Sequence, residues 1–144
     1  MAGTKTLTII KPDAVRKENI GPILEKINAN GFHIAALKLI HLNRGQAERF
    51  YAVHRDKFFF EGLVNFMTSG QVVVAILEKE NAVADYRRLM GTTDPAKAEE
   101  GTLRKLFAES MERNAVHGSD SDENAETECD FFFARSERFS NFEG

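Results

Sequence analysis

The chain has 144 residues, of which 42% are hydrophobic and 28% charged, and a formal net charge of −3 at pH 7. These values suit a single globular domain over residues 1–144; no apolar run approaches the roughly 20 residues that span a bilayer, and one cysteine, Cys129, excludes an intrachain disulfide and a cysteine zinc site. The scattered lysines and arginines argue against a large nucleic-acid surface, and the first residues do not resemble a signal peptide, so we expect a cytoplasmic protein.

The first part of the chain is predicted to alternate strands and helices. Residues 5–10 alternate and are β-rich, which predicts a strand ending in a loop that carries Lys11. Apolar residues at helical spacing predict a helix over residues 21–30, with Gly31 just beyond its end. Residues 32–42 then predict a long strand.

Two helices, a buried strand and a further helix follow. Helical patterns cover residues 46–53 and surround residues 63–67. Residues 71–77 form an almost unbroken apolar run, which is typical of a central strand buried on both faces. Residues 81–90 predict a helix that Gly91 closes.

The last third is less regular. Residues 91–117 are polar and predict a long irregular loop, a kind of segment that often carries function. Residues 122–128 predict a short helix and residues 129–134 a strand, before a polar tail. This order predicts an α+β fold, a ferredoxin-like split βαβ antiparallel sheet with additional helices packed on one face. Because that scaffold carries many functions, the fold alone does not identify this one.

The run over residues 114–121 is the strongest candidate for chemistry. Its neutral His117 imidazole can attack phosphorus near pH 7 without first losing a proton. Alternatively, one of residues 119–121 simply caps a helix that starts near Asp122, with Glu123 completing an approximate capping box. Both interpretations can hold together, because a residue just before a capped helix is held rigidly.

A nucleotide site in this chain would lack the common phosphate-binding loops. Neither a Walker loop nor a kinase glycine-rich loop is present. The acids after His117 also make that helix start a poor cradle for an anion, so lysine, arginine and bound Mg²⁺ would have to meet phosphate charge. Arg87, Arg88 and Arg104 are suitable donors, although a helix-end or solvated arginine is equally ordinary.

Aromatic and other histidine residues give weaker signals. Three consecutive rings at residues 58–60 cannot all enter one core, so at least one is expected to be exposed and able to stack on a nucleobase. His33 and His41 lack metal-ligand spacing and are predicted to be structural. His54 is ambiguous.

Taken together, these residues resemble the nucleoside diphosphate kinase family. The resemblance covers nearly the whole chain, and the separated motifs make coincidence very unlikely. The matching segments are IKPDAV at 10–15, FF at 59–60, GLV at 62–64, Arg87 with LMG at 89–91, Thr93 before Pro95, GTLR at 101–104 and NAVHGSDS at 114–121.

The resemblance implies an enzyme that maintains nucleotide pools by two-step phosphoryl transfer. A nucleoside triphosphate, typically ATP, phosphorylates His117, and a nucleoside diphosphate then collects the phosphoryl group. Mg²⁺ is expected to arrive on the nucleotide's phosphates rather than in a protein cage. The family also implies a homo-oligomer, a tetramer or a hexamer, and neither a membrane nor a specific nucleic acid is an expected partner.

Several side chains would hold the nucleotide by family analogy. Arg87, Thr93 and Arg104 would bind phosphates, and His54 would lie near the distal phosphates. Asn114 would contact the ribose region.

The remaining roles concern the base and the nucleophile. Phe59 would stack on the base and Met111 would line its other side. Lys11 would serve the transferred group and the sugar side, and Tyr51 would orient Lys11 and the histidine. Glu128 would hydrogen-bond the unreactive imidazole nitrogen and fix the tautomer.

The sequence departs from the family pattern at a few positions. Phe58 stands where proline is common, Asp94 where asparagine is usual, and Asp122 where valine is frequent; Lys-Leu at 105–106 replaces the usual Gly-Asp. The negative charge of Asp94 beside Thr93 could weaken nucleotide binding, and Phe58 loosens a turn that proline would preset.

Two alternatives belong to other classes of function. A ferredoxin-like module could bind nucleotide or RNA without catalysis through Phe59 and the rings at 131–133, although it would need a basic stripe. A scaffold derived from an enzyme could keep only an assembly surface, but no chemical group is missing from the expected site.

Overall fold

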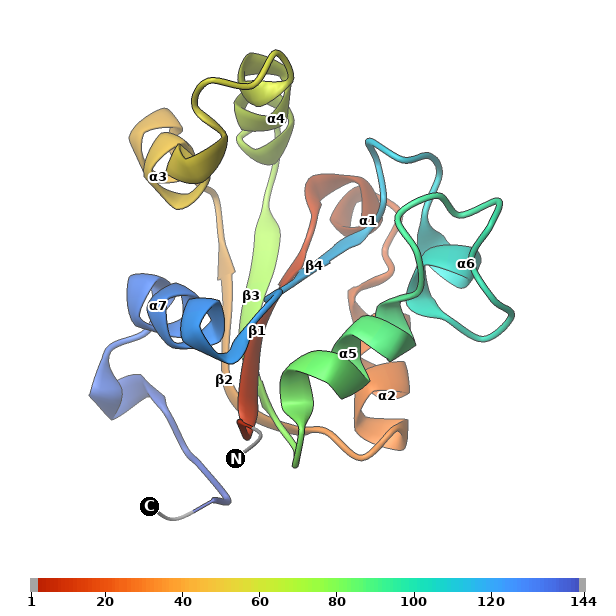
Figure 1. Cartoon of the computed structure of the whole chain (residues 1–144), viewed down its shortest axis with the longest axis vertical. Coiled ribbons are helices and arrows are strands. Elements are labelled where there is room, and N and C mark those ends of the chain that lie inside the picture. Colours follow the sequence, from red (N-terminus) through yellow and green to blue (C-terminus); the bar gives the residue numbers. More distant parts are fainter. Residues whose placement is uncertain (1–2, 143–144) are drawn as a thin grey trace.

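A four-stranded antiparallel sheet forms the centre of the fold in the computed structural model, which describes residues 3–142 (Figure 1). Its strands are β1 (Lys5–Ile10), β2 (His33–Ile40), β3 (Val72–Glu78) and β4 (Val116–Gly118). They lie in the order β2-β3-β1-β4, which is the arrangement of a split βαβ sheet. The predicted α+β, ferredoxin-like fold is therefore confirmed.

Helices connect the strands. Strands β2 and β3 are joined by α3 and α4, and α5 and α6 lead from β3 toward β4. The helices are α1 (Pro12–Arg16), α2 (Ile20–Ala29), α3 (Arg44–Phe50), α4 (Phe60–Met67), α5 (Ala82–Met90), α6 (Leu103–Phe107) and α7 (Asp122–Phe132), with short 3₁₀ turns at Ala52–His54 and Arg135–Glu137.

The helices cover both faces of the sheet rather than the single face expected. One buried cluster lies between the sheet and α1, α2, α5 and α6, and the other lies on the face with α4 and α7. Figure 1 shows these two groups on opposite sides of the strands. Every residue of β3 is buried, which confirms the prediction of a central strand; Val73 and Val74, for example, enter different clusters.

The end of the chain differs from its prediction. Residues 129–134 were expected to form a strand, but Cys129 to Phe132 are the last turn of α7, and the fourth strand is β4 instead. Ala125 and Cys129, four residues apart, are both buried against the sheet, so packing overrides the β propensity of the rings that follow. A strand as short as β4 is too brief to show periodicity.

Two short helices also lie outside the predicted elements. Helix α1 begins at Pro12, whose fixed φ suits a first helical turn. Helix α6 lies inside the segment expected to be irregular, and the Thr102 side chain caps it by accepting from Lys105 N at 3.3 Å. Both helices are five residues long, which is too short for a clear helical repeat.

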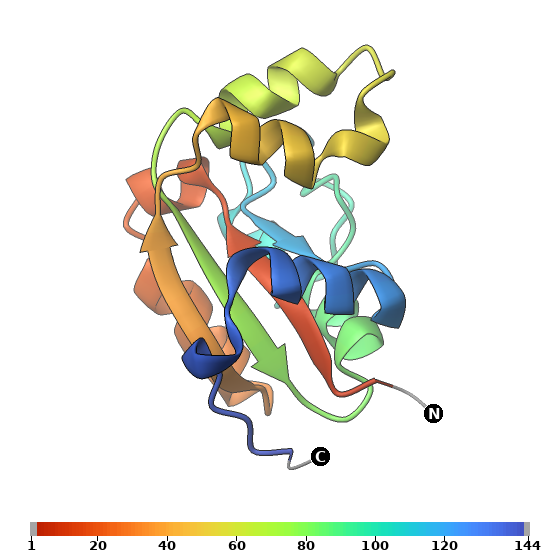
Figure 2. The same ribbon diagram turned by 90° about the vertical axis from the view of Figure 1, so that its left-hand side faces the viewer.

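The polar tail continues along the sheet after α7 (Figure 2). Phe139 N donates to the carbonyl oxygen of Ala35 at 2.8 Å, and His33 Nε2 donates to the carbonyl oxygen of Phe139 at 2.8 Å. The tail therefore packs beside β2. Among residues 3–142, no helix has the length and apolar character needed to cross a membrane.

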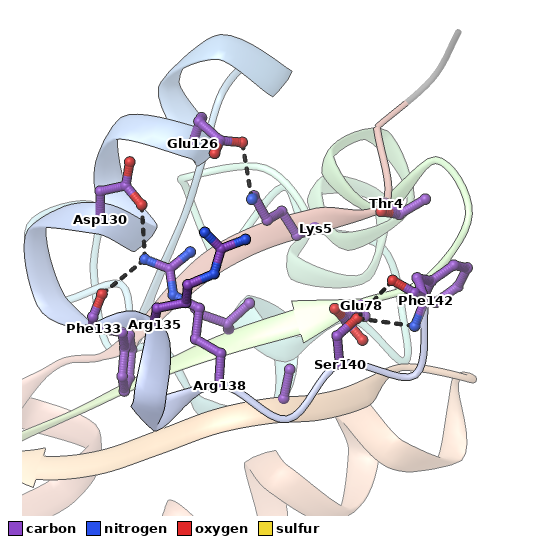
Figure 3. Close-up of a pocket in the computed structure, with 12 residues that line it drawn as sticks. Thr4, Lys5, Glu78, Glu126, Asp130, Phe133, Arg135, Arg138, Ser140 and Phe142 are labelled. Carbon is purple, nitrogen blue, oxygen red and sulfur yellow. Dashed lines mark hydrogen bonds and ion pairs between the residues drawn. The ribbon is translucent and has the colours of Figure 1, made fainter. Parts of the chain in front are cut away.

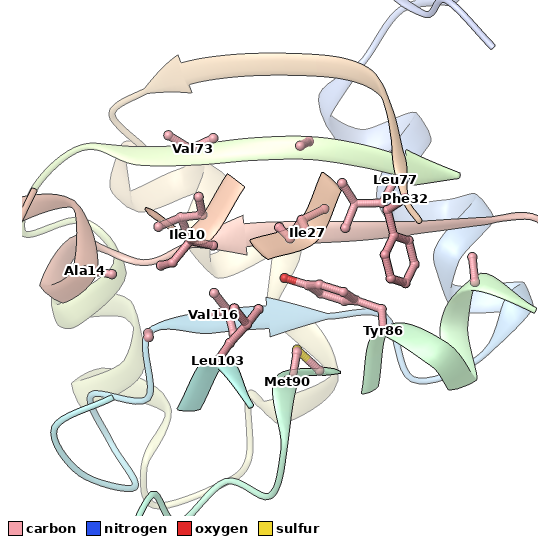
Figure 4. Close-up of a cluster of buried hydrophobic side chains, with 14 residues drawn as sticks. Ile10, Ala14, Ile27, Phe32, Val73, Leu77, Tyr86, Met90, Leu103 and Val116 are labelled. Atoms are coloured by element: carbon pink, nitrogen blue, oxygen red, sulfur yellow. The ribbon is translucent and has the colours of Figure 1, made fainter. Parts of the chain in front are cut away.

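A buried hydroxyl pair links α5 to the sheet within the first cluster. Figure 4 shows Tyr86 pointing between the strands toward Val116. Tyr86 Oη lies 2.6 Å from Thr8 Oγ1, and Thr8 Oγ1 donates to the carbonyl oxygen of His117 at 2.9 Å. Tyr86 Oη therefore donates to Thr8, and the pair ties α5, β1 and β4 together.

We predict that Tyr86→Phe destabilises the fold by about 1–3 kcal/mol, because Thr8 loses a buried partner while the ring remains. Urea unfolding followed by circular dichroism measures this change. Phe32→Leu, in the same cluster, is a control that alters packing without removing a hydrogen bond. Unchanged stability of Tyr86→Phe would contradict the proposed contribution of the hydroxyl pair.

Candidate active site

His117 occupies the middle of β4, the edge strand that pairs with β1. Its backbone lies opposite Ile9. Val116 and Gly118 are buried, whereas the imidazole is partly exposed. A side chain at Gly118 would not fit, because a Cβ there would lie 2.8 Å from Met90 Cε. The glycine beside the histidine therefore allows β4 to approach α5 closely.

A carboxylate on α7 determines which imidazole nitrogen is free. His117 Nε2 lies 2.9 Å from Glu128 Oε1. A carboxylate accepts hydrogen bonds, so Nε2 carries the hydrogen and Nδ1 keeps the lone pair. Ser119 Oγ also donates to Glu128 Oε1 at 2.8 Å and accepts from Leu7 N at 3.1 Å. The sequence predicted Ser119 only as a possible helix cap, and no local pattern indicated this contact with Glu128.

The helix after the histidine is capped by Ser121. The Ser121 side chain accepts a hydrogen bond from Asn124 N at 3.0 Å. The expected pairing of Asp120 with Glu123 in a capping box is therefore wrong, since Asn124 holds the relevant position. The expectation that one of residues 119–121 caps a helix starting near Asp122 is confirmed.

Aromatic rings pack around the imidazole. The Phe50 ring lies edge-on to His117, with centroids 5.5 Å apart and an interplanar angle of 71°. The ring centroids of Phe50 and Tyr51 are 5.0 Å apart, also in an edge-on arrangement. The Tyr51 hydroxyl is buried without a hydrogen-bond partner in the described part of the chain. Burial, and then the Glu128 charge, raise the pKa of Tyr51 far above its ordinary value, so it stays neutral.

Lys11 and Asn114 form a buried pair near the histidine strand. Lys11 Nζ donates to Asn114 Oδ1 at 2.8 Å, and Asn114 Nδ2 donates to the carbonyl oxygen of Met111 at 2.9 Å. Burial, with a further contribution from the Arg104 charge, lowers the pKa of Lys11 to about 8. The structure thus brings together two predicted site residues from distant parts of the chain.

Arg104 is fixed by backbone contacts and is not a freely solvated side chain. Its Nη1 donates to Gly91 O at 3.1 Å, its Nη2 to Val116 O at 2.9 Å, and its Nε to Asn114 O at 3.4 Å. Arg87 and Arg104 line one hollow of about 440 Å³. Arg88 and Glu99 line the same hollow, and Arg104 connects it to β4 through its hydrogen bond to Val116 O.

Thr93 lies in the exposed turn that follows α5. The neighbouring Thr92 lines the hollow, whereas Thr93 is not among its lining residues. Asp94 Oδ1 accepts from Ala96 N at 3.0 Å, so the carboxylate stabilises the turn. Asp94, which departs from the family pattern, therefore has a structural contact of its own beside Thr93, the predicted phosphate donor.

The predicted base-binding residues are partly exposed. Phe59 is 41% exposed and Phe58 is 99% exposed, with their ring centroids 5.6 Å apart. Phe60 packs against the second buried cluster, so the expectation that at least one of the three rings is exposed is confirmed. The His54 ring lies 5.4 Å from Phe59, and Met111 is exposed in its loop. No contact in the structure explains the full exposure of Phe58.

His33 and His41 have structural contacts, as predicted, and Cys129 is buried in the core. His33 Nε2 and His41 Nε2 each donate to a backbone carbonyl oxygen, at 2.8 and 2.9 Å respectively. Cys129 is fully buried in α7, and burial raises the pKa of its thiol to about 12.

A larger groove, of about 780 Å³, lies between α7, the tail and the start of β1 (Figure 3). Lys5 pairs there with Glu126 at 2.9 Å, and Arg138 pairs with Asp130 at 2.7 Å. Its lining contains none of the predicted site residues. Size therefore does not identify the reaction site in this molecule.

Comparison with known proteins gives a consistent family. The family model described as "Nucleoside diphosphate kinase" matches residues 4–138. A protein named nucleoside diphosphate kinase from Nitratiruptor sp. is 58% identical over 133 residues, which cover 92% of this chain and 97% of that protein. Nucleoside diphosphate kinase 1 of Protochlamydia amoebophila is 57% identical over 137 residues, covering 95% of this chain and 97% of its own.

Solved structures show the same similarity. The Aquifex aeolicus nucleoside diphosphate kinase superposes with a TM-score of 0.92 at 41% identity, covering 94% of this chain and 98% of that chain. A halophilic nucleoside diphosphate kinase from Halobacterium salinarum, in complex with CDP, gives a TM-score of 0.91 at 34% identity, covering 96% and 93% of the two chains.

We predict that the pKa of Lys11 makes stability rise with pH in a defined window. Burial lowers this pKa from 10.5 to about 8, so between these values the unfolded chain binds a proton that the folded chain has released. The free energy of unfolding, measured in urea at several pH values, should therefore rise through the window relative to Lys11→Met. A difference between the two proteins that does not change with pH would contradict the assignment.

Proposed function

This chain belongs to the nucleoside diphosphate kinase family, and we propose that His117, Lys11, Arg87 and Arg104 carry that family's reaction in it. The enzyme transfers the terminal phosphoryl group of a nucleoside triphosphate, typically ATP, to a nucleoside diphosphate, and so maintains NTP and dNTP pools. The contact between His117 Nε2 and Glu128 Oε1, 2.9 Å long, is the observation that carries this proposal.

His117 Nδ1 acts as the nucleophile. Its lone pair forms a bond to the terminal phosphorus while the bond to the bridging oxygen breaks, and the nucleoside diphosphate leaves. The hydrogen on Nε2 stays in place, so the phosphorylated ring carries positive charge that the Glu128 carboxylate stabilises. A second nucleoside diphosphate then attacks the phosphohistidine in the reverse sense. The buried Tyr51 is proposed to orient Lys11 and the His117 ring.

Cations supply most of the electrostatic stabilisation. The transition state of phosphoryl transfer is loose and spreads negative charge over the transferred oxygens. A guanidinium has five N–H donors, and backbone carbonyls take three of those of Arg104. Its position is therefore set before substrate arrives, while two donors remain for phosphate oxygens. Lys11, Arg87 and Thr93 complete the phosphate contacts.

The nucleoside is held with little discrimination between bases. The exposed Phe59 face stacks on the base, with Met111 on its other side, and a stacking ring does not recognise base edges. Asn114 contacts the ribose region, and its bond to Lys11 couples the sugar to the phosphate side. His54, beside Phe59, lies on the side of the distal phosphates.

Mg²⁺ is proposed to enter with the nucleotide. Residues 3–142 contain no group of three or more His, Cys, Asp or Glu side chains that could hold a metal ion. The side chains around His117 instead offer lysine, arginine and amide groups, which suit a cation held by the nucleotide's own phosphates. When bound, Mg²⁺ neutralises phosphate charge, and the protein side chains orient the same phosphates.

We also propose that the chain forms a homo-oligomer, a tetramer or a hexamer. Strand β2 is an edge strand of the sheet, and it exposes Leu37 by 50% and Leu39 by 56%. Exposed apolar side chains on an edge strand favour pairing with another chain. The alternative of a non-catalytic nucleotide-binding or RNA-binding module has no support, because the relatives reported above are named as kinases.

We predict that ATP labelled on its terminal phosphate transfers the label to His117 when Mg²⁺ is present. The label should be acid-labile and base-stable, and a nucleoside diphosphate should discharge it. His117→Ala should take up no label, and chelation of Mg²⁺ should prevent labelling of the wild type.

A matched control is His41→Ala, because the His41 ring hydrogen-bonds to the carbonyl oxygen of Thr68, which is not one of the proposed site residues. It should be labelled as fast as the wild type. Equal labelling of His117→Ala, or no labelling of the folded wild type, would exclude the proposed reaction.

We predict that Asp94→Asn lowers KM for the nucleotide about 2- to 5-fold. The substitution removes a negative charge whose repulsion of phosphate weakens binding by roughly 1 kcal/mol or less. The amide keeps an oxygen for the turn contact to Ala96 N. KM should be measured at low and high salt, where screening should shrink the difference. Glu25→Gln, an exposed acid on α2, is the control; an equal effect there would remove the local explanation.

A further inference from the structure

The backbone makes a strained turn just before His117. Ala115 is fully buried and has a φ of 72°, in the left-handed region that favours glycine. Val116 N donates to Asn114 O at 2.9 Å, which closes a three-residue γ-turn centred on Ala115. A γ-turn of this hand is rare and costs conformational energy, so the surrounding structure must hold it.

The beginning of α1 holds this turn. Ala115 N donates to Asp13 Oδ2 at 3.2 Å, and Lys11 N donates to Ala115 O at 2.8 Å. Both polar backbone groups of Ala115 are therefore bound by residues about 100 positions earlier in the chain. Arg104 binds the carbonyl oxygens on either side, those of Asn114 and Val116.

Asp13 is an unusual residue to find in this position for packing alone. It is only 3% exposed, and its Oδ1 is buried without a hydrogen-bond partner among residues 3–142. Burying a carboxylate is costly when its oxygens are only partly satisfied. The ordinary role of an acid in a first helical turn, to complement the helix dipole, does not require burial. The one hydrogen bond of the Asp13 carboxylate is to Ala115 N, and its other favourable interaction in the described structure is with the charge of Lys11.

We propose that Asp13 is a positioning residue for phosphoryl transfer: its carboxylate holds the strained turn at Ala115 and so sets Asn114 and His117 in their relative positions. The turn is the only covalent path between these two side chains. A change in its φ would move the imidazole relative to Lys11 and Asn114, and displacement of a reacting group by about 1 Å costs on the order of 100-fold in rate. This inference rests on the proposed function of His117.

Three substitutions separate the position of the carboxylate oxygen from its charge. Asp13→Asn keeps an acceptor for Ala115 N and removes the charge, whereas Asp13→Glu keeps the charge and displaces the acceptor by one methylene. Asp13→Ala removes both. We expect the rate of His117 phosphorylation at saturating ATP and Mg²⁺ to fall less than about 10-fold in Asp13→Asn and on the order of 100-fold in Asp13→Glu and Asp13→Ala.

A glycine at position 115 provides an independent test of strain. Glycine adopts a positive φ without steric cost, so the turn needs less support in Ala115→Gly. The rate loss caused by Asp13→Glu or Asp13→Ala should therefore be several-fold smaller in the glycine background than in the alanine background. Nucleotide affinity and the urea midpoint of each variant distinguish a slower chemical step from weaker binding or unfolding.

Each outcome decides the matter. A large loss in Asp13→Asn with a small loss in Asp13→Glu would show that Asp13 acts through its charge on Lys11 and would overturn the proposal. Equal losses in both turn backgrounds would also overturn it, because strain would then have no part. If Asp13→Ala does not fold, the comparison of the Asn and Glu variants remains decisive. Failure of the wild type to be labelled would instead refute the function of His117 itself.

Discussion

The hydrogen bond between His117 Nε2 and Glu128 Oε1 joins the central sheet to α7, and the proposed chemistry depends on it. It determines which nitrogen carries the hydrogen and which presents a lone pair. The bond can form because successive side chains of β4 face opposite layers of the fold. Val116 points into the cluster with α5, so His117 must point toward α7. Helices on both faces of the sheet are therefore a functional requirement as well as a structural one.

The cationic side of the site carries an electrostatic cost in the free protein. Lys11 is buried, and its ammonium group lies near the positive charge of Arg104, which together lower its pKa. The Asp13 charge offsets part of this cost, and phosphate oxygens of a bound nucleotide would add negative charge and relieve the remaining repulsion. Contacts to Asn114 and to backbone carbonyl oxygens hold Lys11 and Arg104 in place in the free protein, but these neutral oxygens add no negative charge to offset the repulsion.

The sequence predicted the strands and helices whose patterns are long enough to be seen, and its motifs identified the family to which the chain belongs. Strand β3 is an example, because an apolar run of that length has few other interpretations. The end of α7 was predicted incorrectly, since its phenylalanines have β propensity and only contact with the sheet makes them helical. Ser119 and Phe50 were missed as neighbours of the histidine for a related reason. Their roles come from contacts across the fold, and no local spacing records such contacts.

Two of the departures from the family pattern, Phe58 and Asp94, lie next to residues proposed to bind the nucleotide. Phe58 is exposed beside the ring proposed to stack on the base, and Asp94 stabilises the turn that carries a proposed phosphate donor. Neither contacts His117, Glu128 or the turn at Ala115. Changes at these positions can therefore alter how tightly a nucleotide binds while leaving the nucleophile in place. A substitution that changes the turn at Ala115 would instead affect the nucleophile. The positions of His117, Asn114 and the buried Lys11 all depend on the same few backbone atoms.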